Sequence, residues 1–367
     1  MAGLYIHIPF CASRCIYCGF YSTTHQELQE RYVNALCREM HLRPAPHEVI
    51  ETIYLGGGTP SQLSFGRLSR LLSYIYKVYE VSPSAEVTIE CNPDDVCHED
   101  FALPPVVNRV SMGVQTFSDA QLQFLHRRHS SQQVWDAIAK LRRAGIHNIS
   151  IDLMFGFPDE TLIQWQNDLQ QALRLQVEHI SAYSLMYEEG TPLFRMLEEG
   201  HVRETDEELM RSMYETLVDT LTHAGYEHYE ISNFALPGKR SRHNSSYWQD
   251  KPYMGLGAAA HSYDLHQRQW NVSNLHAYLQ AIEGGKVPFE AEPIDEATHY
   301  NDLVTTALRT CEGMNLQQLS APYHDYLLAQ AQPFIEQGTL AHTGNRLHLT
   351  PQGIFISDTI MAALVYV

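Results

Sequence analysis

The stretch Gly3-Leu-Tyr-Ile-His-Ile-Pro-Phe-Cys11-Ala-Ser-Arg-Cys15-Ile-Tyr-Cys18 joins a short apolar run to three closely spaced cysteines. Residues 3–8 are rich in apolar and β-branched side chains, which predicts a buried strand. The cysteines follow within one short segment, so a single loop at the end of this strand can carry all three thiols. The strand and its loop set the expectations for the rest of the chain.

Three thiolates can hold three irons of a cubane [4Fe–4S] cluster, as cysteines do in iron–sulfur proteins. The fourth iron then has no protein ligand and can accept the amino and carboxylate groups of the methionine in S-adenosylmethionine (SAM). The alternatives are a zinc site or structural cysteines. Zinc sites usually pair two CxxC units, and no second Cys/His cluster of suitable spacing is present. The remaining cysteines are scattered and are predicted to be small buried residues: Cys37, Cys91, Cys97 and Cys311.

Strand-like runs alternate with helical patterns through the first two-thirds of the chain. The predicted strands are Gly3–Ile8, Thr52–Leu55, Glu86–Glu90, Arg109–Gly113, Asn148–Leu153 and His179–Leu185. The predicted helices lie near 26–41, 66–79, 119–143, 160–174 and 205–224. Such alternation predicts parallel strands joined by right-handed crossovers. The fold class that follows is α/β, a partial (β/α)6 TIM-type barrel.

Polar or glycine-rich residues stand at the end of each predicted strand. They are Cys11, the triplet 56–58, residues 90–92, Gln115, Asp152 and Ser184. In a β/α barrel the chemistry is located on the loops at the carboxyl ends of the strands. These side chains are therefore expected to meet at one mouth.

The chain is predicted to have three parts: a barrel over 1–235, a connecting segment over 236–290, and a small C-terminal α+β domain over 291–367. Residues 295–335 have a helical pattern. Residues 338–349 are typical of a hairpin with its turn at 342–345. A helix-rich unit closed by a hairpin indicates a winged-helix-like domain.

Composition limits the classes of function. The chain has 367 residues, 44% of them hydrophobic, and a formal net charge of −18 from 25 Lys+Arg and 43 Asp+Glu. Nucleic-acid binding normally needs a basic surface, so none is expected. No signal peptide and no apolar stretch of about 20 residues is visible. We therefore expect a cytoplasmic protein that is not integral to a membrane, with the oligomeric state, a homodimer included, left open.

Several polar residues are candidates to surround the cluster. Gly57 and Gly58 permit close backbone approach to a ligand, and the segment lacks the lysine of a phosphate-binding loop. Glu90 is placed to accept hydrogen bonds from ribose hydroxyls, as acidic residues do in dinucleotide folds; the alternative is a surface carboxylate. Gln115, Arg127 and Asp152 could line the same cavity, or act as salt-bridge or capping residues.

Several motifs together resemble the family of oxygen-independent coproporphyrinogen III dehydrogenase and the HemW-type haem chaperones. They occur in order over most of the chain: residues 5–11, the CxxxCxxC loop, 56–60, Glu90-Cys-Asn-Pro93, Ser111-Met-Gly-Val-Gln115 and Ile151-Asp-Leu153. The resemblance implies a radical-SAM fold with Cys11, Cys15 and Cys18 as cluster ligands. It also implies SAM contacts from Tyr5, Tyr17, Gly57, Gly58, Thr59, Glu90, Gln115, Arg127, Asp152 and His261.

His261 is implicated through the glycine-rich segment Gly255-Leu-Gly-Ala-Ala-Ala-His261. The alternative interpretation of this segment is a dinucleotide fingerprint. That motif requires a strand–helix unit of a particular shape around it, which is absent here.

Two departures separate the relatives. The dehydrogenase has a fourth cysteine two positions after the third, where this chain has Phe20, and a long segment before its first strand. HemW-type proteins have His-Asn-x-x-Tyr-Trp, present here at 243–248. A haem site needs an axial ligand and an apolar wall, so the resemblance implies haem contacts from His243, Tyr247 and Trp248. Without the resemblance, His243 would be interpreted as a structural or surface residue.

The expected function is a haem chaperone that carries a SAM-binding [4Fe–4S] cluster and passes haem to apo-haemoproteins, membrane respiratory enzymes among them. Whether the protein is an enzyme is left open. The enzymatic alternative is coproporphyrinogen III dehydrogenase or another radical-SAM reaction of porphyrin metabolism. A third alternative is a winged-helix regulator that senses iron–sulfur status, which the net acidity disfavours.

Overall fold

The computed structural model describes residues 2–43 and 48–367. All six predicted strands are present: β1 (Ala2–Ile8), β2 (Ile50–Gly57), β3 (Val81–Cys91), β4 (Arg109–Gln115), β5 (Ile149–Phe155) and β6 (His179–Ser184). They pair in chain order, and every ladder between neighbours is parallel. The predicted partial β/α barrel is confirmed.

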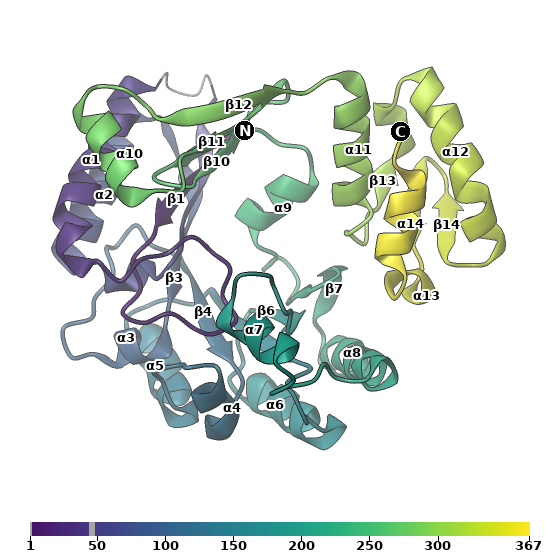
Figure 1. The fold of residues 1–367 in the computed structure, drawn as a ribbon, viewed down its shortest axis with the longest axis horizontal. Helices are drawn as coiled ribbons and strands as arrows, with labels where there is room; N and C mark the ends of the chain where they lie inside the picture. Colours follow the sequence, from purple (N-terminus) through teal and green to yellow (C-terminus); the bar gives the residue numbers. More distant parts are fainter. Residues whose placement is uncertain (1, 44–47) are drawn as a thin grey trace.

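Helices cover the outer face of these strands (Figure 1). They are α1 (Gln29–Leu42), α2 (Phe65–Val78), α3 (Pro93–Cys97), α4 (Asp119–Phe124), α5 (Ser131–Arg143), α6 (Leu162–Arg174) and α8 (Glu207–His223). The prediction of one helical segment over 119–143 is wrong, because α4 and α5 are separate. Ser130 and Gln133 form a capping box at the amino terminus of α5, so a new helix begins there. The six residues between the two helices include Arg127.

Six further strands extend the sheet at both edges, and the sequence did not reveal them. β9 (Tyr253–Leu256) lies parallel to β1, and β10 (His261–Tyr263), β11 (Gln267–Asn271) and β12 (Phe289–Pro293) continue outward in antiparallel pairs. At the other edge β8 (Asn233–Ala235) and β7 (Glu227–Glu230) follow β6. Most of these strands are short and polar, and β12 is exposed throughout, so they lack the apolar run that marks a buried strand.

The glycine-rich segment 255–261 is held on α1. The N–H of Gly257 donates to Glu39 Oε2 at 2.8 Å, and the N–H of Ala258 donates to the Tyr32 hydroxyl oxygen at 3.0 Å. Glu39 is fully buried and also accepts from Tyr278 Oη at 2.6 Å. A buried carboxylate with several donors joins the β9–β10 turn to the first helix.

The two faces of the central sheet have opposite chemistry. Outward-facing residues are apolar and buried: Leu4, Ile6, Ile53, Leu55, Val87, Ile89, Val110, Met112, Ile149, Ile151 and Leu153. Their neighbours along each strand point inward, because successive side chains alternate. These inward residues are mostly polar: Tyr5, Tyr54, Glu90, Arg109, Ser111, Ser150, Asp152, Ser181 and Tyr183. The helices therefore pack on an apolar surface, whereas the interior of the barrel is lined by polar and charged side chains.

Helix α9 (Arg242–Trp248) closes one end of this interior. The backbone N–H of His243 donates to Glu86 Oε1 at 3.1 Å, and its ring Nδ1 lies 2.8 Å from Thr52 Oγ1. Thr52 and Glu86 are near the amino-terminal halves of β2 and β3, whereas the cysteine loop follows the carboxyl end of β1. We call the α9 end the floor of the interior and the cysteine end its mouth.

The C-terminal unit has its own core. It contains α11 (Glu296–Ala307), β13 (Met314–Asn315), α12 (Ala321–Glu336), β14 (Leu340–Thr343), β15 (Arg346–Leu349) and α14 (Ser357–Leu364), with the antiparallel order β13-β15-β14. The predicted hairpin is confirmed, with its turn at Gly344-Asn345. The expectation of helix throughout 295–335 is wrong, because β13 interrupts it to pair with β15.

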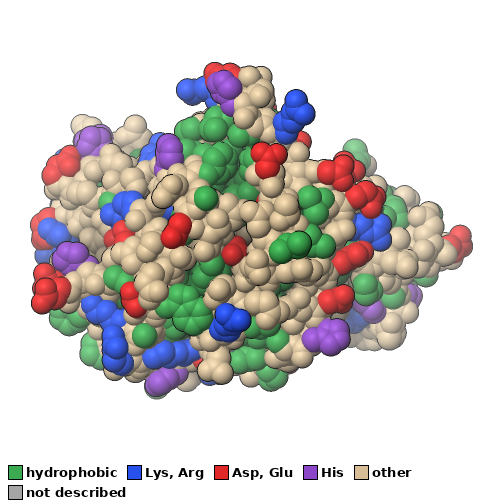
Figure 2. All heavy atoms as spheres, turned by 90° about the horizontal axis from the view of Figure 1, so that it is seen from below, with side chains coloured by type: hydrophobic (Ala, Val, Ile, Leu, Met, Phe, Trp, Pro, Cys, Tyr) green, Lys and Arg blue, Asp and Glu red, His purple; other side chains and the backbone are tan. Residues whose placement is uncertain are grey.

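The C-terminal unit contacts the barrel beside α9 (Figure 1). Arg309 Nη2 lies 2.8 Å from Glu230 Oε1, and Arg240 Nη1 lies 2.6 Å from Glu312 Oε1. On the face drawn in Figure 2, Lys and Arg side chains lie in small groups interspersed with acidic ones. Within residues 2–43 and 48–367, no helix combines the length and apolarity needed to cross a membrane.

We expect Gly257→Ala to destabilise the protein strongly. Gly257 has φ +103°, and an added Cβ would overlap the Tyr32 hydroxyl and lie 2.8 Å from the carbonyl oxygen of His7. Gly238 is the matched control, because its φ is +74° and nothing lies within 4 Å of an added Cβ. Gly238→Ala should cost about 1 kcal/mol from backbone strain alone, and Gly257→Ala about 2 kcal/mol more, from overpacking. Equal unfolding midpoints for the two variants would contradict the packing of this segment on α1.

Candidate functional site

The polar interior forms one central cavity of about 610 Å³ that opens at the mouth. The three cysteines of the loop line it. So do all the predicted SAM contacts except His261: Tyr5, Tyr17, Gly57, Gly58, Thr59, Glu90, Gln115, Arg127 and Asp152. Residues from five strands and three loops are thus brought to one place.

Ile16 fixes the cysteine loop from within. Its side chain is 4% exposed and packs in a small apolar cluster that includes Leu125 and Leu193. Its N–H donates to Leu125 O at 3.3 Å, and its carbonyl accepts from Leu193 N–H at 3.0 Å. The flanking residues Cys15 and Tyr17 are consequently held at the rim of the cavity.

The chemistry of the thiols fits an iron–sulfur cluster. Cys11, Cys15 and Cys18 are free and partly accessible, and thiolates are the usual ligands of such clusters. Two donors point at the sulfurs: Thr59 Oγ1 lies 3.5 Å from Cys11 Sγ, and Arg127 Nη1 lies 3.6 Å from Cys15 Sγ. Hydrogen bonds to cluster sulfurs tune reduction potential. In the described chain, no three or more His, Cys, Asp or Glu side chains converge on a position for one metal ion.

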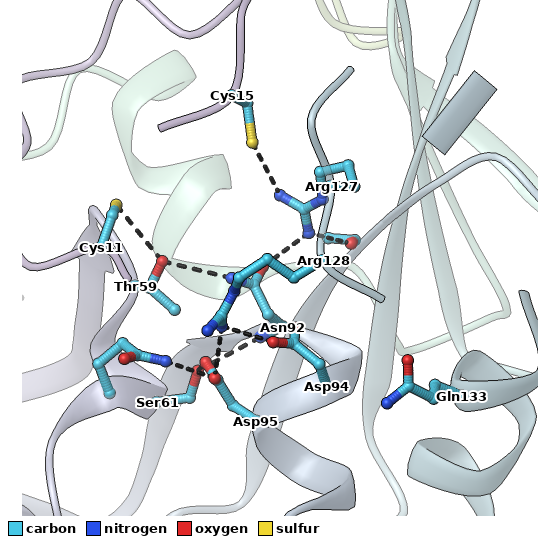
Figure 3. Close-up of polar contacts among 12 residues, drawn as sticks. Cys11, Cys15, Thr59, Ser61, Asn92, Asp94, Asp95, Arg127, Arg128 and Gln133 are labelled. Atoms are coloured by element: carbon cyan, nitrogen blue, oxygen red, sulfur yellow. Dashed lines mark hydrogen bonds and ion pairs between the residues drawn. The ribbon is translucent and has the colours of Figure 1, made fainter. Parts of the chain in front are cut away.

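Arg127 and Thr59 belong to one hydrogen-bonded chain, shown in Figure 3. Arg127 Nη2 donates to Asn92 Oδ1 at 2.7 Å and to Gly113 O at 2.6 Å, and Asn92 Nδ2 donates to Thr59 Oγ1 at 3.4 Å. A side chain at Gly113 would crowd Arg127, since an added Cβ would lie 3.1 Å from its Nη2. The chain connects Cys11 to Cys15 through loops that follow three different strands.

Glu90 faces the cavity from the end of β3. Its Oε1 accepts from Tyr54 Oη at 2.8 Å, and its Oε2 accepts from the N–H of Gly57 at 3.0 Å. Burial, together with the negative charge of Asp152, raises the pKa of Glu90 to about 7, although the hydrogen bonds from Tyr54 and Gly57 oppose the shift. A surface carboxylate would show neither the burial nor this shift, so the position agrees with a ligand-facing role.

Asp152 and Gln115 reach the cavity by different routes. Asp152 was expected at the end of a strand, but β5 continues to Phe155 and the side chain points inward from its middle. Burial raises the pKa of Asp152 to about 6, although hydrogen bonds from Ser181 and Ser111 oppose the shift. Gln115 has φ +68° at a register shift between β4 and β5, and a bulge of this kind re-aims a side chain.

His261 does not reach the cavity. It begins β10, its side chain is exposed, and its ring stacks on Trp270 with the centroids 6.2 Å apart. The glycine-rich segment that suggested it packs against α1. The described structure therefore gives His261 no contact with the other predicted SAM residues.

The His-Asn-x-x-Tyr-Trp segment is α9 itself. Its Asn244 lines the cavity, whereas His243, Tyr247 and Trp248 are not among the lining residues. His243 is buried, and both of its ring nitrogens have partners: Nδ1 has Thr52, and Nε2 lies 2.8 Å from Tyr247 Oη. Burial, together with the positive charge of Arg109, lowers the pKa of His243 to about 3, so the imidazole is neutral at pH 7. Trp248 faces the C-terminal unit, with the Arg309 guanidinium 5.3 Å from its ring.

The four remaining cysteines differ in exposure. Cys91 is buried, and Cys37 and Cys97 are half-buried. The expectation of burial is wrong for Cys311, which is exposed beside Arg240 and Glu312 in the C-terminal unit. Arg240 Nη2 lies 3.8 Å from its sulfur.

Sequence reasoning missed several residues that line the cavity. Asn92 lay within a motif but was given no role, Asn244 was hidden in the α9 segment, and Arg109 was read only as the start of a strand. Alternation along β4 from Gly113 back to Arg109 could have revealed the last of these. At the mouth, Phe20 and Met186 are 71% and 60% exposed and give the rim an apolar character.

Known proteins resemble the chain over its whole length. A family model described as the radical SAM superfamily matches residues 5–172, and one described as the HemN C-terminal domain matches residues 294–356. A protein named heme chaperone HemW from Lactococcus lactis is 34% identical over 97% of this chain and 95% of its own length. Its namesake from Bacillus subtilis is 33% identical over 100% and 99%.

Among solved structures, the radical SAM enzyme coproporphyrinogen III oxidase (HemN) from Escherichia coli superposes with a TM-score of 0.83 at 21% identity. The match covers 99% of this chain and 90% of that one. At this level of identity the likeness establishes the fold.

We expect ionisation of Glu90 to lower the free energy of unfolding of the ligand-free protein as pH rises. A carboxyl whose pKa is higher in the folded state than in the unfolded state stabilises the fold at low pH and loses that advantage as pH rises from about 4.5 to about 7. Glu90→Gln removes the titration, so its stability relative to wild type should increase by about 1–3 kcal/mol between pH 5 and pH 8. Chemical unfolding at the two pH values measures this difference. A pH-independent difference would contradict the burial of Glu90.

Proposed function

Because the chain belongs to the HemW family of radical SAM, HemN-like proteins, we propose that it is a haem chaperone acting in the cytoplasm. It would bind haem as cargo and pass it to apo-haemoproteins, with respiratory enzymes as the expected class. The relatives from Lactococcus lactis and Bacillus subtilis are named heme chaperones, which supports haem binding. The particular recipient proteins and the site of action are our inference.

We propose that Cys11, Cys15 and Cys18 hold a [4Fe–4S] cluster whose fourth iron binds SAM. When bound, the cluster would supply a one-electron centre beside SAM. The side chains of the cavity would then orient the SAM molecule. Glu90 and Asp152 offer acceptors for ribose hydroxyls, and Arg127 and Thr59 hold donors against the sulfurs.

The observation that favours a chaperone over a dehydrogenase is Phe20. It stands two positions after Cys18, where the dehydrogenase has its fourth cysteine, and its ring is 71% exposed at the rim of the cavity. With Met186 it presents apolar surface around an otherwise polar opening. An exposed apolar rim suits contact with a flat apolar macrocycle, which would bury both side chains.

For the axial ligand of haem we retain His243. A neutral imidazole is the form that ligates iron, and burial keeps His243 neutral. Its Nε2 is at present engaged with Tyr247 Oη, so ligation requires that bond to open. Tyr247 and Trp248 would contribute aromatic surface on either side of α9. Nucleic acid is not among the proposed partners, given the net charge of −18.

The proposal is tested by supplying the anaerobically reconstituted protein with haem, or with coproporphyrinogen III, SAM and a reductant. We expect haem binding, transfer of haem to an apo-haemoprotein, and no carbon dioxide from coproporphyrinogen III. Cys15→Ser should lose most of its iron and its broad iron–sulfur absorbance, whereas Cys311→Ser, which alters an exposed thiol in the C-terminal unit, should keep both. Robust decarboxylation of coproporphyrinogen III would instead support the dehydrogenase hypothesis.

Tyr247→Phe tests the axial ligand separately. Removing the hydroxyl frees Nε2 of His243 from a competing hydrogen bond, so haem should bind roughly 2- to 10-fold more tightly. His243→Ala should shift or abolish the Soret band of the complex. If both variants bind haem with wild-type spectra and affinity, the ligand is another residue and His243 serves only to hold α9 in place.

A further inference from the structure

Arg109 is a buried cation without a partner. Its side chain is 1% exposed, and its Nε and Nη1 atoms are buried with no hydrogen-bond partner among the described residues. An ionised group taken out of water is costly unless it is paired. Because Arg109 also lines the central cavity, its guanidinium is placed to pair with an anionic group of a ligand.

The carboxylates near Arg109 do not supply that partner. Asp152 is close enough for Arg109 to affect its pKa, yet no ion pair within 4 Å joins the two among the described residues. Asp152 instead accepts from Ser181 and Ser111. Glu86, on the strand beside Arg109, accepts from the backbone N–H groups of Arg242 and His243. The carboxylates around Arg109 are thus engaged elsewhere.

A second unsatisfied group lies beside Arg109. Thr88 on β3 is its direct neighbour in the β3–β4 register. Its side chain is fully buried, and its Oγ1 has no hydrogen-bond partner. Buried polar atoms in proteins are nearly always paired. Arg109 lines the central cavity, whereas Thr88 lies beside it in the register and is not itself a lining residue.

The position distinguishes this ligand group from the carboxylate of SAM. Arg109 faces the central cavity but starts β4, whereas Gln115 ends it toward the mouth. Six residues of strand separate them, about 20 Å at 3.3 Å per residue. The open iron that would take the carboxylate of SAM belongs to the cysteine loop at the mouth. The cation lies close to the floor, near His243.

We propose that Arg109, with Thr88 beside it, is an anchor for a carboxylate carried on a flexible arm of the cargo, namely a propionate of haem. A guanidinium presents paired N–H groups that match the two oxygens of a carboxylate, and the hydroxyl of Thr88 can donate to the same group. This inference rests on the proposed function, because haem is the carboxylate-bearing ligand that the function supplies. It adds a contact that depends on the side arms of the macrocycle and leaves the axial ligand to a separate residue.

The test compares haem with haem dimethyl ester, in which the carboxylates are masked, on the full-length, cluster-reconstituted protein. A charge-assisted contact should give wild type a roughly 10- to 100-fold preference for haem over the ester. Arg109→Met should abolish the preference, Arg109→Lys should retain part of it, and the isosteric Thr88→Val should reduce it. Arg70→Met, which changes an exposed arginine of α2 outside the cavity, should leave it unchanged.

Two further measurements separate an anchor from a structural arginine. Protoporphyrin IX without iron should show the same dependence on Arg109, since no axial ligation is involved. The unfolding midpoint of ligand-free Arg109→Met should equal or exceed that of wild type, because an unpaired buried charge is removed. Wild-type haem and ester affinities that are equal, or a preference that survives in Arg109→Met, would overturn the anchor while leaving the chaperone proposal intact. Failure of wild type to bind haem at all would overturn both.

Discussion

The structure depends on the strict alternation of side chains along six parallel strands. One set, with Leu4, Ile53 and Val110 among its members, is buried under the surrounding helices. The other set, with Tyr5, Glu90 and Asp152, faces a cavity. A one-residue shift in the pairing of a strand would turn its polar side chains toward the helices and its apolar side chains into the cavity. The same register that stabilises the fold therefore also assembles the site.

This constraint explains why the sequence predicted so much of the barrel. The apolar faces of β1 to β6 carry a strong local signal, and the cysteine loop lies directly after the first strand. The edge strands were missed because their stability comes from pairing rather than from apolar burial. β12 is exposed throughout, and β9 needs Gly257 to approach Tyr32 closely. The local pattern of apolar and polar residues contains no information about contacts between segments that are far apart in the sequence.

The site shows the same division. Glu90, Gln115 and Arg127 were predicted because motifs contain them, but the bonds that position Arg127 depend on a break between α4 and α5 that a periodic pattern concealed. His261 was placed by its motif alone, and the segment around it turned out to pack on α1. Arg109 and Thr88 were missed because their significance is the absence of a partner, which only tertiary structure reveals. The cavity brings together thiols at its mouth, two arginines, Arg109 and Arg127, and the rings of Tyr5 and Tyr54.

The most direct test of the central claim, that the mouth of this cavity holds a cluster with one open iron for SAM, is electron paramagnetic resonance of the reduced, reconstituted protein with and without SAM. Three cysteine ligands and a vacant iron predict that SAM changes the g-values of the reduced [4Fe–4S] cluster. The change should require Cys11, Cys15 and Cys18 together, and should need more SAM when Glu90 is replaced by alanine. A signal that SAM leaves unchanged would contradict the account, because every iron would then be closed to it.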